Sequence, residues 1–226
     1  MKYKNLLKDS KAYYEDNNYY EIFSQAEDYE NKVRDYLEKL SKNKIVVDAG
    51  CGTGKYLNTL ENNSKQYIGI DLSDKQLEKA QNKSQKETSI FINTNLKNIP
   101  LEDNSIDLVI STWVLGTITD LLEREQCLNE LKRILKIEGI LILVENDEDS
   151  QFEKIRDRDK DTRTKDYNDW IKNHNLVEDK KINTYFNFHD LETTKKCFEV
   201  IYGKEISNKI NTNKIEHKII IFKYIK

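Results

Sequence analysis

The sequence of 226 residues is poor in proline and glycine, with one Pro and seven Gly. This composition excludes collagen-like, proline-rich and Gly/Ser-linker proteins. It also makes a glycine cluster informative, and three of the seven glycines stand within five residues, at Gly50, Gly52 and Gly54. With 37% hydrophobic and 34% charged residues, the chain is expected to form one soluble globular domain.

Cysteines and long apolar runs are scarce as well. Cys51, Cys127 and Cys197 form no C-x-x-C pair, which predicts neither a disulfide framework nor a zinc site. No run approaches the ~18 to 20 apolar residues that cross a bilayer, and the N-terminus lacks the apolar segment of a signal peptide. We therefore expect a cytoplasmic protein without a metal site or a membrane segment.

An excess of charge of one sign is also missing. Lys and Arg total 37 against 40 Asp and Glu, so the net charge is −3. Such a chain has no global positive field to hold a nucleic-acid backbone, although a local basic patch stays compatible with it. On this ground we do not expect a nucleic-acid partner.

Five short apolar segments alternate with helical patterns, at residues 45–47, 67–70, 89–92, 106–111 and 140–144. This alternation predicts a doubly wound α/β sheet, whose ligands bind beyond the carboxyl ends of the strands. The residues at those ends are Asp48, Asp71, Asn95, Ser111 and Glu145. Ser73 and Gln76 have the spacing of a capping box that starts a helix, and the longest helix is predicted at residues 120–136, with Gly139 as its stop signal.

The pattern changes after residue 145. Residues 146–166 are nearly all charged or polar, which predicts a mobile loop or a solvated helix without a buried face. A short helix around Trp170, a strand near 182–188, a helix over 193–202 and a last strand over 217–224 follow, with His217 at the start of an edge strand. Since no repeat or linker indicates a second domain, residues 1–226 are expected to form one.

The glycine cluster lies in the pattern D-x-G-x-G-x-G, which begins at Asp48. Alternate glycines let the backbone turn tightly and approach a ligand, and the helix that follows presents free N–H groups. An ordinary strand-to-helix turn needs only one glycine. A nicotinamide-type Rossmann fingerprint requires another glycine three residues after Gly52, where this sequence has Lys55.

From residue 45 to about 144 these motifs, in this order, resemble the class I S-adenosylmethionine-dependent methyltransferases, and the likeness extends more weakly to the C-terminus. The resemblance implies a Rossmann-like seven-stranded sheet whose last strand is antiparallel. It implies S-adenosyl-L-methionine as cofactor and S-adenosyl-L-homocysteine as product. It also implies an enzyme, monomeric or homodimeric, that transfers a methyl group to a small-molecule acceptor by in-line displacement.

The resemblance also assigns cofactor-binding residues. The glycine loop of that family passes along the methionine part of the cofactor, and Asp71 ends the second strand, where a carboxylate can accept hydrogen bonds from both ribose hydroxyls. Asn95 stands where the family usually has an Asp that contacts the adenine amine, which an amide oxygen can also do; a plain polar turn is the alternative. The full set of cofactor candidates is Asp48, Gly50, Cys51, Gly52, Thr53, Gly54, Asp71, Leu72, Asn95, Leu96, Ser111 and Thr112.

The catalytic residue stays unassigned. Methyl transfer from a sulfonium needs the nucleophile held near the methyl carbon in a site that excludes water, and it needs no metal. An amine acceptor need only be neutral, whereas a hydroxyl or carbon acid calls for a general base. Many relatives have a His just after the fourth strand, but residues 114–117 contain none, and His174, His189 and His217 do not fill this gap convincingly.

Aromatic residues near the N-terminus are the candidates for the acceptor site. Tyr14, Tyr19 and Tyr20, together with Trp113, could stabilise a sulfonium or ammonium by cation–π attraction of ~0.5 to 2 kcal/mol, or the tyrosines could pack the first helix on the sheet. We expect residues 1–43 to form a helical lid, 44–145 the cofactor-binding core, 146–178 a charged insertion and 179–226 the C-terminal strands and helix.

Two other functions remain open. The chain could bind the cofactor as a non-catalytic partner or regulator of another protein. It could also methylate RNA or a protein side chain. Six Lys and Arg stand within residues 154–165, but interleaved Asp residues make this segment read as a solvated face more than as a phosphate track.

Overall fold

The computed structural model describes residues 18–226, and this part of the chain forms a seven-stranded sheet in the order β3-β2-β1-β4-β5-β7-β6. Strands β1 to β5 pair in parallel, and β7 is antiparallel to both of its neighbours. The doubly wound architecture with an antiparallel last strand is thereby confirmed. The strands are β1 (Ile45–Ala49), β2 (Gln66–Asp71), β3 (Ile90–Asn93), β4 (Ile106–Thr112), β5 (Leu135–Asn146), β6 (Val177–Asn187) and β7 (Lys214–Ile225).

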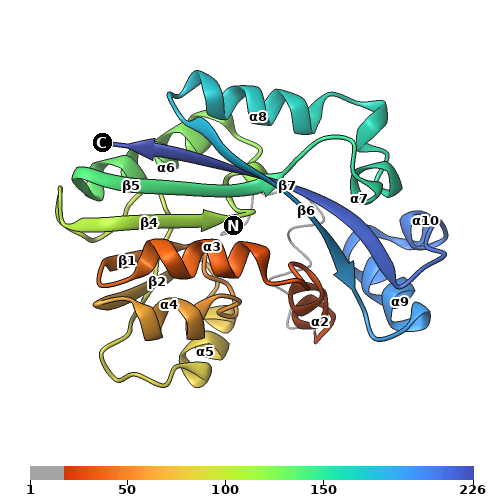
Figure 1. The fold of residues 1–226 in the computed structure, drawn as a ribbon, viewed down its shortest axis with the longest axis horizontal. Helices are drawn as coiled ribbons and strands as arrows, with labels where there is room; N and C mark the ends of the chain where they lie inside the picture. The colour runs from red at the N-terminus through yellow and green to blue at the C-terminus, as the bar shows by residue number, and fades with distance from the viewer. Residues whose placement is uncertain (1–17) are drawn as a thin grey trace.

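Helices cover both faces of this sheet: in Figure 1, α3 and α4 lie on one side and α6 and α8 on the other. The helices are α2 (Asn18–Ala26), α3 (Lys32–Ser41), α4 (Leu57–Asn63), α5 (Asp74–Lys83), α6 (Leu121–Ile134), α7 (Gln151–Ile155), α8 (Arg163–Asn173), α9 (Leu191–Tyr202) and α10 (Lys204–Ser207), with short 3-10 turns η1 (Leu115–Thr117) and η2 (Arg158–Lys160).

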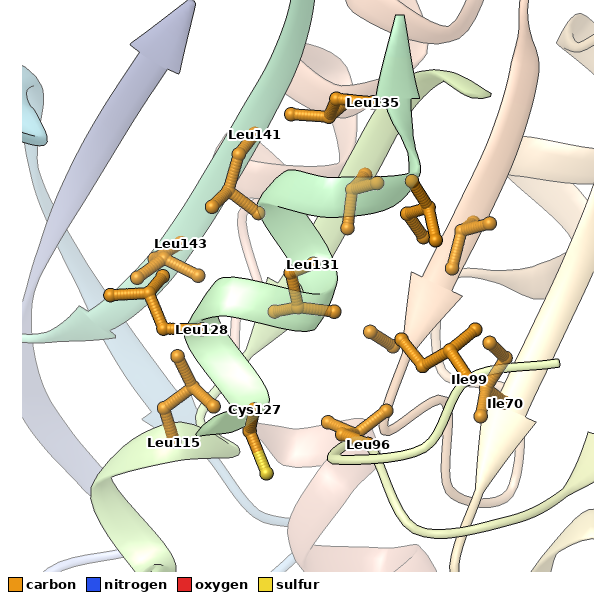
Figure 2. Close-up of a cluster of buried hydrophobic side chains, with 14 of the residues drawn as sticks. Ile70, Leu96, Ile99, Leu115, Cys127, Leu128, Leu131, Leu135, Leu141 and Leu143 are labelled. Carbon is orange, nitrogen blue, oxygen red and sulfur yellow. The ribbon is translucent and has the colours of Figure 1, made fainter. Parts of the chain in front are cut away.

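Two apolar clusters form because neighbouring residues of a strand point to opposite faces. Val46 packs with α3 and α4, while Val47 packs with α6. Figure 2 shows Leu128 and Leu131 of α6 beside residues of β5, among them Leu141. Each of these fully buried side chains contributes about 1.5 to 3 kcal/mol, so the two clusters hold the strand ends that carry the candidate site in place.

The junction of α6 and β5 differs from the prediction. The helix ends at Ile134, and β5 begins at Leu135, five residues before the predicted strand. Leu135 pairs with Ile106 at the start of β4, and an irregularity in register separates this pair from the next one. Leu135 was predicted to belong to the helix, but it pairs with β4 in the sheet instead. Gly139 therefore lies inside β5 and does not mark the end of the helix.

Residues 146–166 were predicted to form a mobile loop or a solvated helix without a buried face. The structure corrects this prediction, because part of the segment is buried. Ser150, Phe152 and Glu153 are buried, and the Ser150 hydroxyl caps α7 by accepting a hydrogen bond from the Glu153 N–H at 3.1 Å. The ring of Phe152 packs 4.6 Å from that of Phe186 in β6. A single aromatic residue thus anchors a polar segment to the sheet.

The third apolar cluster lies where β6 and β7 continue past the carboxyl ends of β4 and β5 (Figure 1). There Phe23 of α2 packs 4.8 Å from Phe186 and 5.8 Å from Phe198 of α9. His217 is fully buried in the same region, because β6 pairs outside β7 and makes β7 an inner strand. The prediction that His217 begins an edge strand was therefore wrong.

Candidate active site

The glycine loop after β1 has a backbone that only glycine adopts readily. Gly50, Gly52 and Gly54 all have positive φ, of 81°, 54° and 81°. At Gly50 a β-carbon would lie 2.3 Å from Cγ2 of Val114, so the loop also approaches the residues after β4 too closely for any side chain. The N–H groups of Gly50 and Cys51 donate to the Ile70 carbonyl at 2.7 and 3.0 Å, which ties the loop to the end of β2.

Asp71 at the end of β2 holds the same loop from its other side. One carboxylate oxygen accepts from the Gly52 N–H and the other from the Ser73 N–H, each at 2.8 Å. The predicted cap of α5 is present, since the Ser73 hydroxyl accepts from the Gln76 N–H at 3.4 Å. Asp71 is buried and also lines the main cavity, so its carboxylate both shapes the loop and faces a ligand.

Asp48 and Cys51 are buried at the base of the loop. The Tyr67 hydroxyl donates to Asp48 at 3.1 Å, and burial raises the pKa of the Asp48 carboxyl to about 7. Burial also raises the pKa of the Cys51 thiol well above its ordinary value, which keeps it protonated and removes it as a nucleophile. Both residues therefore serve the shape of the loop, and Cys51 also reaches the cavity wall.

The cavity has a volume of about 560 Å³ and lies beyond the carboxyl ends of β1, β2, β4 and β5. The candidate residues that line it are Gly50, Cys51, Gly52, Asp71, Thr112, Trp113 and Tyr20. Within residues 18–226, its lining does not include the candidates Asp48, Thr53, Gly54, Leu72, Asn95, Leu96, Ser111 and Tyr19. Tyr14 lies outside the described residues. The structure thus brings together the loop, the β2 carboxylate and the end of β4.

Two of the candidates outside the cavity wall already have partners within the fold. The Asn95 amide donates to Glu123 of α6 at 3.0 Å, and its oxygen accepts from the Lys97 N–H at 2.9 Å. The Ser111 hydroxyl donates to the Ala49 carbonyl at 3.0 Å. Contact of Asn95 with an adenine ring stays a prediction.

At the end of β5, Glu145 lines the cavity and is only 4% exposed. Its carboxyl accepts a hydrogen bond from the Tyr167 hydroxyl of α8 at 2.8 Å. Burial raises the pKa of Glu145 to about 8, against the opposing effects of Tyr167 and Arg124. Arg124 lies over the rings of Tyr167 and Trp170, at 5.0 and 5.3 Å from their centroids. Glu145 is therefore mostly protonated in neutral solution.

Asn146 has one determined orientation. Its oxygen lies 3.1 Å from Nε1 of Trp113 and 2.9 Å from Nε2 of His217. The indole N–H is only a donor, so the atom that it meets must be the amide oxygen, and His217 must then carry its proton on Nε2. Burial lowers the pKa of His217 well below its ordinary value, so the ring is neutral.

An ion pair between Glu27 and Lys55 also lies at the cavity wall. Lys55, just after the glycine loop, contacts Glu27 at 2.6 Å, and its ammonium lies 4.4 Å above the ring of Trp113. Burial raises the pKa of Glu27, which the attraction of Lys55 opposes. This pair links the segment after α2 to the residues after β4.

The charged insertion contributes Arg156, Arg158 and Arg163 to the cavity lining. The guanidinium of Arg156 lies 3.9 Å from the ring centroid of Phe152 and 5.5 Å from that of Tyr202, and it forms an ion pair with the buried Glu153. These residues correct the expectation of a purely solvated face. The sequence analysis missed these three arginines as cavity residues. They reach the cavity because α7 packs against β7, and the local helical pattern does not predict that contact.

Two further findings bear on the kind of site. Among residues 18–226, no three His, Cys, Asp or Glu side chains gather closely enough to hold a metal ion. In the same part of the chain, every helix is too short or too polar to cross a membrane.

Comparison with known proteins gives one family match and several relatives. Residues 47–143 match a family model described as a methyltransferase domain. The tRNA (carboxymethyluridine(34)-5-O)-methyltransferase of Arabidopsis thaliana is 31% identical over 112 residues, which are 50% of this chain but 26% of that protein. The uncharacterized protein MJ1252 of Methanocaldococcus jannaschii is 27% identical, over 84% of this chain and 79% of its own length.

One solved structure shares the fold of this chain over nearly its whole length. The crystal structure of a SAM-dependent methyltransferase from Aquifex aeolicus has a TM-score of 0.54 and 16% identity, and the match covers 96% of this chain and 98% of that one. At this identity the likeness concerns the fold alone. The family match, in contrast, spans the segment that carries the glycine loop, Asp71 and the end of β4.

Proposed function

Since the chain belongs to the class I S-adenosylmethionine-dependent methyltransferases, we propose that it transfers the methyl group of this cofactor to a small-molecule acceptor. The observation that supports a small acceptor is the cavity itself. Its volume of about 560 Å³ is in the range of small-molecule pockets. Its lining includes four aromatic residues from four helices, Phe23 of α2, Phe152 of α7, Trp170 of α8 and Tyr202 of α9.

The residues at the glycine loop fit the cofactor of this family. A β-carbon at Gly52 would lie 2.9 Å from Oε1 of Gln76 and 3.0 Å from the Tyr20 hydroxyl, so a side chain there would displace the ends of both residues. We propose that the loop lies along the methionine part. Asp71 lines the same cavity, and we propose that its carboxylate accepts hydrogen bonds from the two ribose hydroxyls.

The bound cofactor supplies an electrophilic methyl group on a sulfonium. This chain's own residues then orient the acceptor and exclude water, and the acceptor atom attacks the methyl carbon as the carbon–sulfur bond breaks and its electron pair returns to sulfur. Trp113, held by its N–H on Asn146, follows the strand end that borders the glycine loop. We propose that it forms the boundary between the cofactor and acceptor halves of the cavity.

The other roles assigned from the sequence are part of the same proposal. Residues 1–17 of the predicted lid lie outside the described residues, and residues 18–43 keep the lid role. Residues 44–145 serve as the cofactor-binding core, 146–178 as the insertion that closes the acceptor half and 179–226 as its support, within one domain that acts as a monomer or homodimer. Phe23, buried against Phe186 and Phe198, supports the lid role for the described part of that segment.

A second candidate function is methylation of RNA. It is favoured by the similarity to the tRNA methyltransferase of Arabidopsis thaliana, which covers half of this chain. Because of this relative, the prediction that the protein has no nucleic-acid partner is not supported. The arginines of the insertion that line the cavity are compatible with either acceptor.

Transfer of a radiolabelled methyl group separates the two candidates. The protein is incubated with S-adenosylmethionine labelled in the methyl group and with cell extract divided into a fraction below ~1 kDa, total RNA and total protein. We expect label in the small-molecule fraction, and none with the variant Asp71→Asn at limiting cofactor. Label that enters RNA alone would replace the first candidate with the second. Cofactor binding without label in any fraction would favour a non-catalytic partner.

A further inference from the structure

Glu145 is a buried carboxyl group in the wall of the cavity, at the end of β5. It is only 4% exposed, and it lines the cavity together with Thr112 and Trp113, which stand at the end of β4. The Trp113 N–H donates to the Val144 carbonyl at 2.8 Å, so the two strand ends lie side by side. The carboxyl group therefore borders the ligand space while little of it is open to solvent.

One oxygen of this carboxyl group is held, and the other is available. Oε1 accepts a hydrogen bond from the Tyr167 hydroxyl of α8 at 2.8 Å. Tyr167 is fixed in turn, because its ring stacks on that of Trp170 with 6.0 Å between the centroids. Burial raises the pKa of Tyr167 well above its ordinary value, so the hydroxyl stays a donor. Among residues 18–226, no hydrogen bond reaches Oε2 of Glu145, and this oxygen can meet a ligand.

The charged groups that act on Glu145 come from three other elements. Burial has the largest effect and raises the pKa of the carboxyl to about 8. The Tyr167 hydroxyl of α8 and the positive charge of Arg124 on α6 oppose this rise, whereas the negative charge of Glu27, which follows α2, adds to it. On β7 the residue paired with Glu145 is apolar, Ile220. Glu145 thus keeps its proton at neutral pH and ionises as the pH rises further.

A positive charge inside the cavity would ionise Glu145. The loop after β1 and the end of β5 are separated by β4 and therefore by two strand spacings, roughly 10 Å. At that separation, and at an effective dielectric constant of about 20, a unit positive charge raises the acid dissociation constant of a carboxyl group about tenfold. S-adenosylmethionine carries such a charge on its sulfonium, and S-adenosylhomocysteine does not.

From this arrangement we propose that Glu145 is the proton acceptor of the methyl transfer, and that the methyl acceptor is a phenol or an amine whose reacting atom loses a proton. The inference rests on the proposed function and assigns the catalytic residue that the sequence left open. The lone pair of the acceptor oxygen or nitrogen forms a bond to the methyl carbon, and the carbon–sulfur bond breaks with its electron pair on sulfur. The proton of the acceptor atom moves to Oε2 of Glu145.

The chemistry of the step matches the burial of Glu145. The sulfonium and the carboxylate lose their opposite charges together, and a site of low dielectric favours such a loss. Phenols and ammonium groups dissociate at a pKa of about 10, close enough to that of Glu145 for proton transfer, whereas aliphatic hydroxyls are far less acidic. After the step Glu145 holds the proton, and it releases the proton when the next positive charge enters the cavity.

Proton release on cofactor binding tests this role without knowledge of the acceptor. S-adenosylmethionine and S-adenosylhomocysteine are titrated separately by calorimetry in buffers of different ionisation enthalpy, which gives the protons released per molecule bound. The two ligands differ only in the methyl group and its charge. A tenfold increase of the dissociation constant, from a pKa of about 8, predicts about 0.5 proton more for S-adenosylmethionine at pH 7.5. Its affinity relative to that of S-adenosylhomocysteine should rise roughly eightfold from pH 6 to pH 9.

Three variants connect the excess release to the named residues. Glu145→Gln should abolish it while both ligands still bind. Tyr167→Phe removes the hydrogen bond that favours the carboxylate, so the excess should move to higher pH, which a merely structural role of Tyr167 would not cause. Glu125→Gln is the matched control, because it removes a carboxyl group from exposed surface of α6, outside the cavity lining, and should change nothing.

Transfer of labelled methyl to the small-molecule fraction gives the kinetic counterpart. At saturating cofactor the rate should rise with pH and level off. Glu145→Gln should remove this rise and lower the rate by about 10²- to 10⁴-fold, the usual range for a general base. A labelled product that a cation exchanger retains at acidic pH is a methylated amine, and a neutral one is an aryl methyl ether.

Four results would overturn the proposal. The first is equal proton release by the two ligands in a protein that binds both, and the second is an excess that persists in Glu145→Gln. The third is a rate that Glu145→Gln leaves unchanged. The fourth is label in a quaternary ammonium or sulfonium product, whose formation releases no proton. If neither ligand binds, the proposed function itself fails. The calorimetric result decides the role of Glu145 whichever fraction is labelled.

Discussion

Replacement of Gly50 by alanine should destabilise the protein through two separable effects. The residue has φ of 81°, and a side chain in that region costs about 1 to 3 kcal/mol. The new β-carbon would also lie 2.3 and 2.9 Å from the two γ-carbons of Val114 and 3.1 Å from its β-carbon, so rotation of the valine cannot relieve the contact. Overpacking of this kind costs about 1 to 3 kcal/mol. The sum predicts a loss of about 2 to 6 kcal/mol.

Urea denaturation of a double-mutant cycle isolates the second effect. Combining Gly50→Ala with Val114→Ala should restore about 1 to 3 kcal/mol relative to the sum of the single changes. Gly203→Ala is the matched control, because Gly203 also has positive φ, of 94°, but nothing lies within 4 Å of its β-position. Its cycle with Val114→Ala should be additive to within about 0.5 kcal/mol. Equal coupling energies in the two cycles would refute the close approach of the loop to Val114.

Three further changes test other parts of the site. Asp71→Asn leaves only one of two acceptor oxygens for the N–H groups it holds, and calorimetry should show S-adenosylhomocysteine binding weakened by about 1.5 to 3 kcal/mol; unchanged affinity would remove the ribose role. Glu145→Gln should stabilise the protein by about 2 to 4 kcal/mol at pH 8 and hardly at all at pH 5, because the unfolded chain ionises this carboxyl near pH 4.5 while the native chain keeps its proton until about pH 8; urea curves that show the same gain at both pH values would contradict the raised pKa. Phe23→Ala should cost about 3 to 5 kcal/mol in the same assay, and a loss under about 1 kcal/mol would show that α2 does not pack as part of the core.

The glycine loop and the Asp71 carboxylate, which we propose hold the cofactor, could be predicted from the sequence because their signals are local. Gly50, Gly52 and Gly54 follow a buried strand directly, and their positive φ explains why no other residue stands there. Asp71 likewise ends the next strand. In a parallel sheet such ends meet at one edge, so spacing along the chain is enough to bring the loop and the carboxylate together.

The rest of the cavity lining could not be predicted because it depends on long-range pairing. Asn146 meets His217 only because β7 inserts antiparallel between β5 and β6. Tyr167 reaches Glu145 from a helix whose sequence is mostly polar. Arg156 is half-buried because one aromatic residue, Phe152, anchors its helix, and a charge pattern read along the chain does not show this.

The most direct test of the cofactor site is a calorimetric titration of the protein with S-adenosylhomocysteine. The geometry of the glycine loop and Asp71 predicts saturable binding of one molecule per chain, at concentrations below about 1 mM. Absence of any binding at millimolar concentrations would contradict the assignment of this cavity to the cofactor.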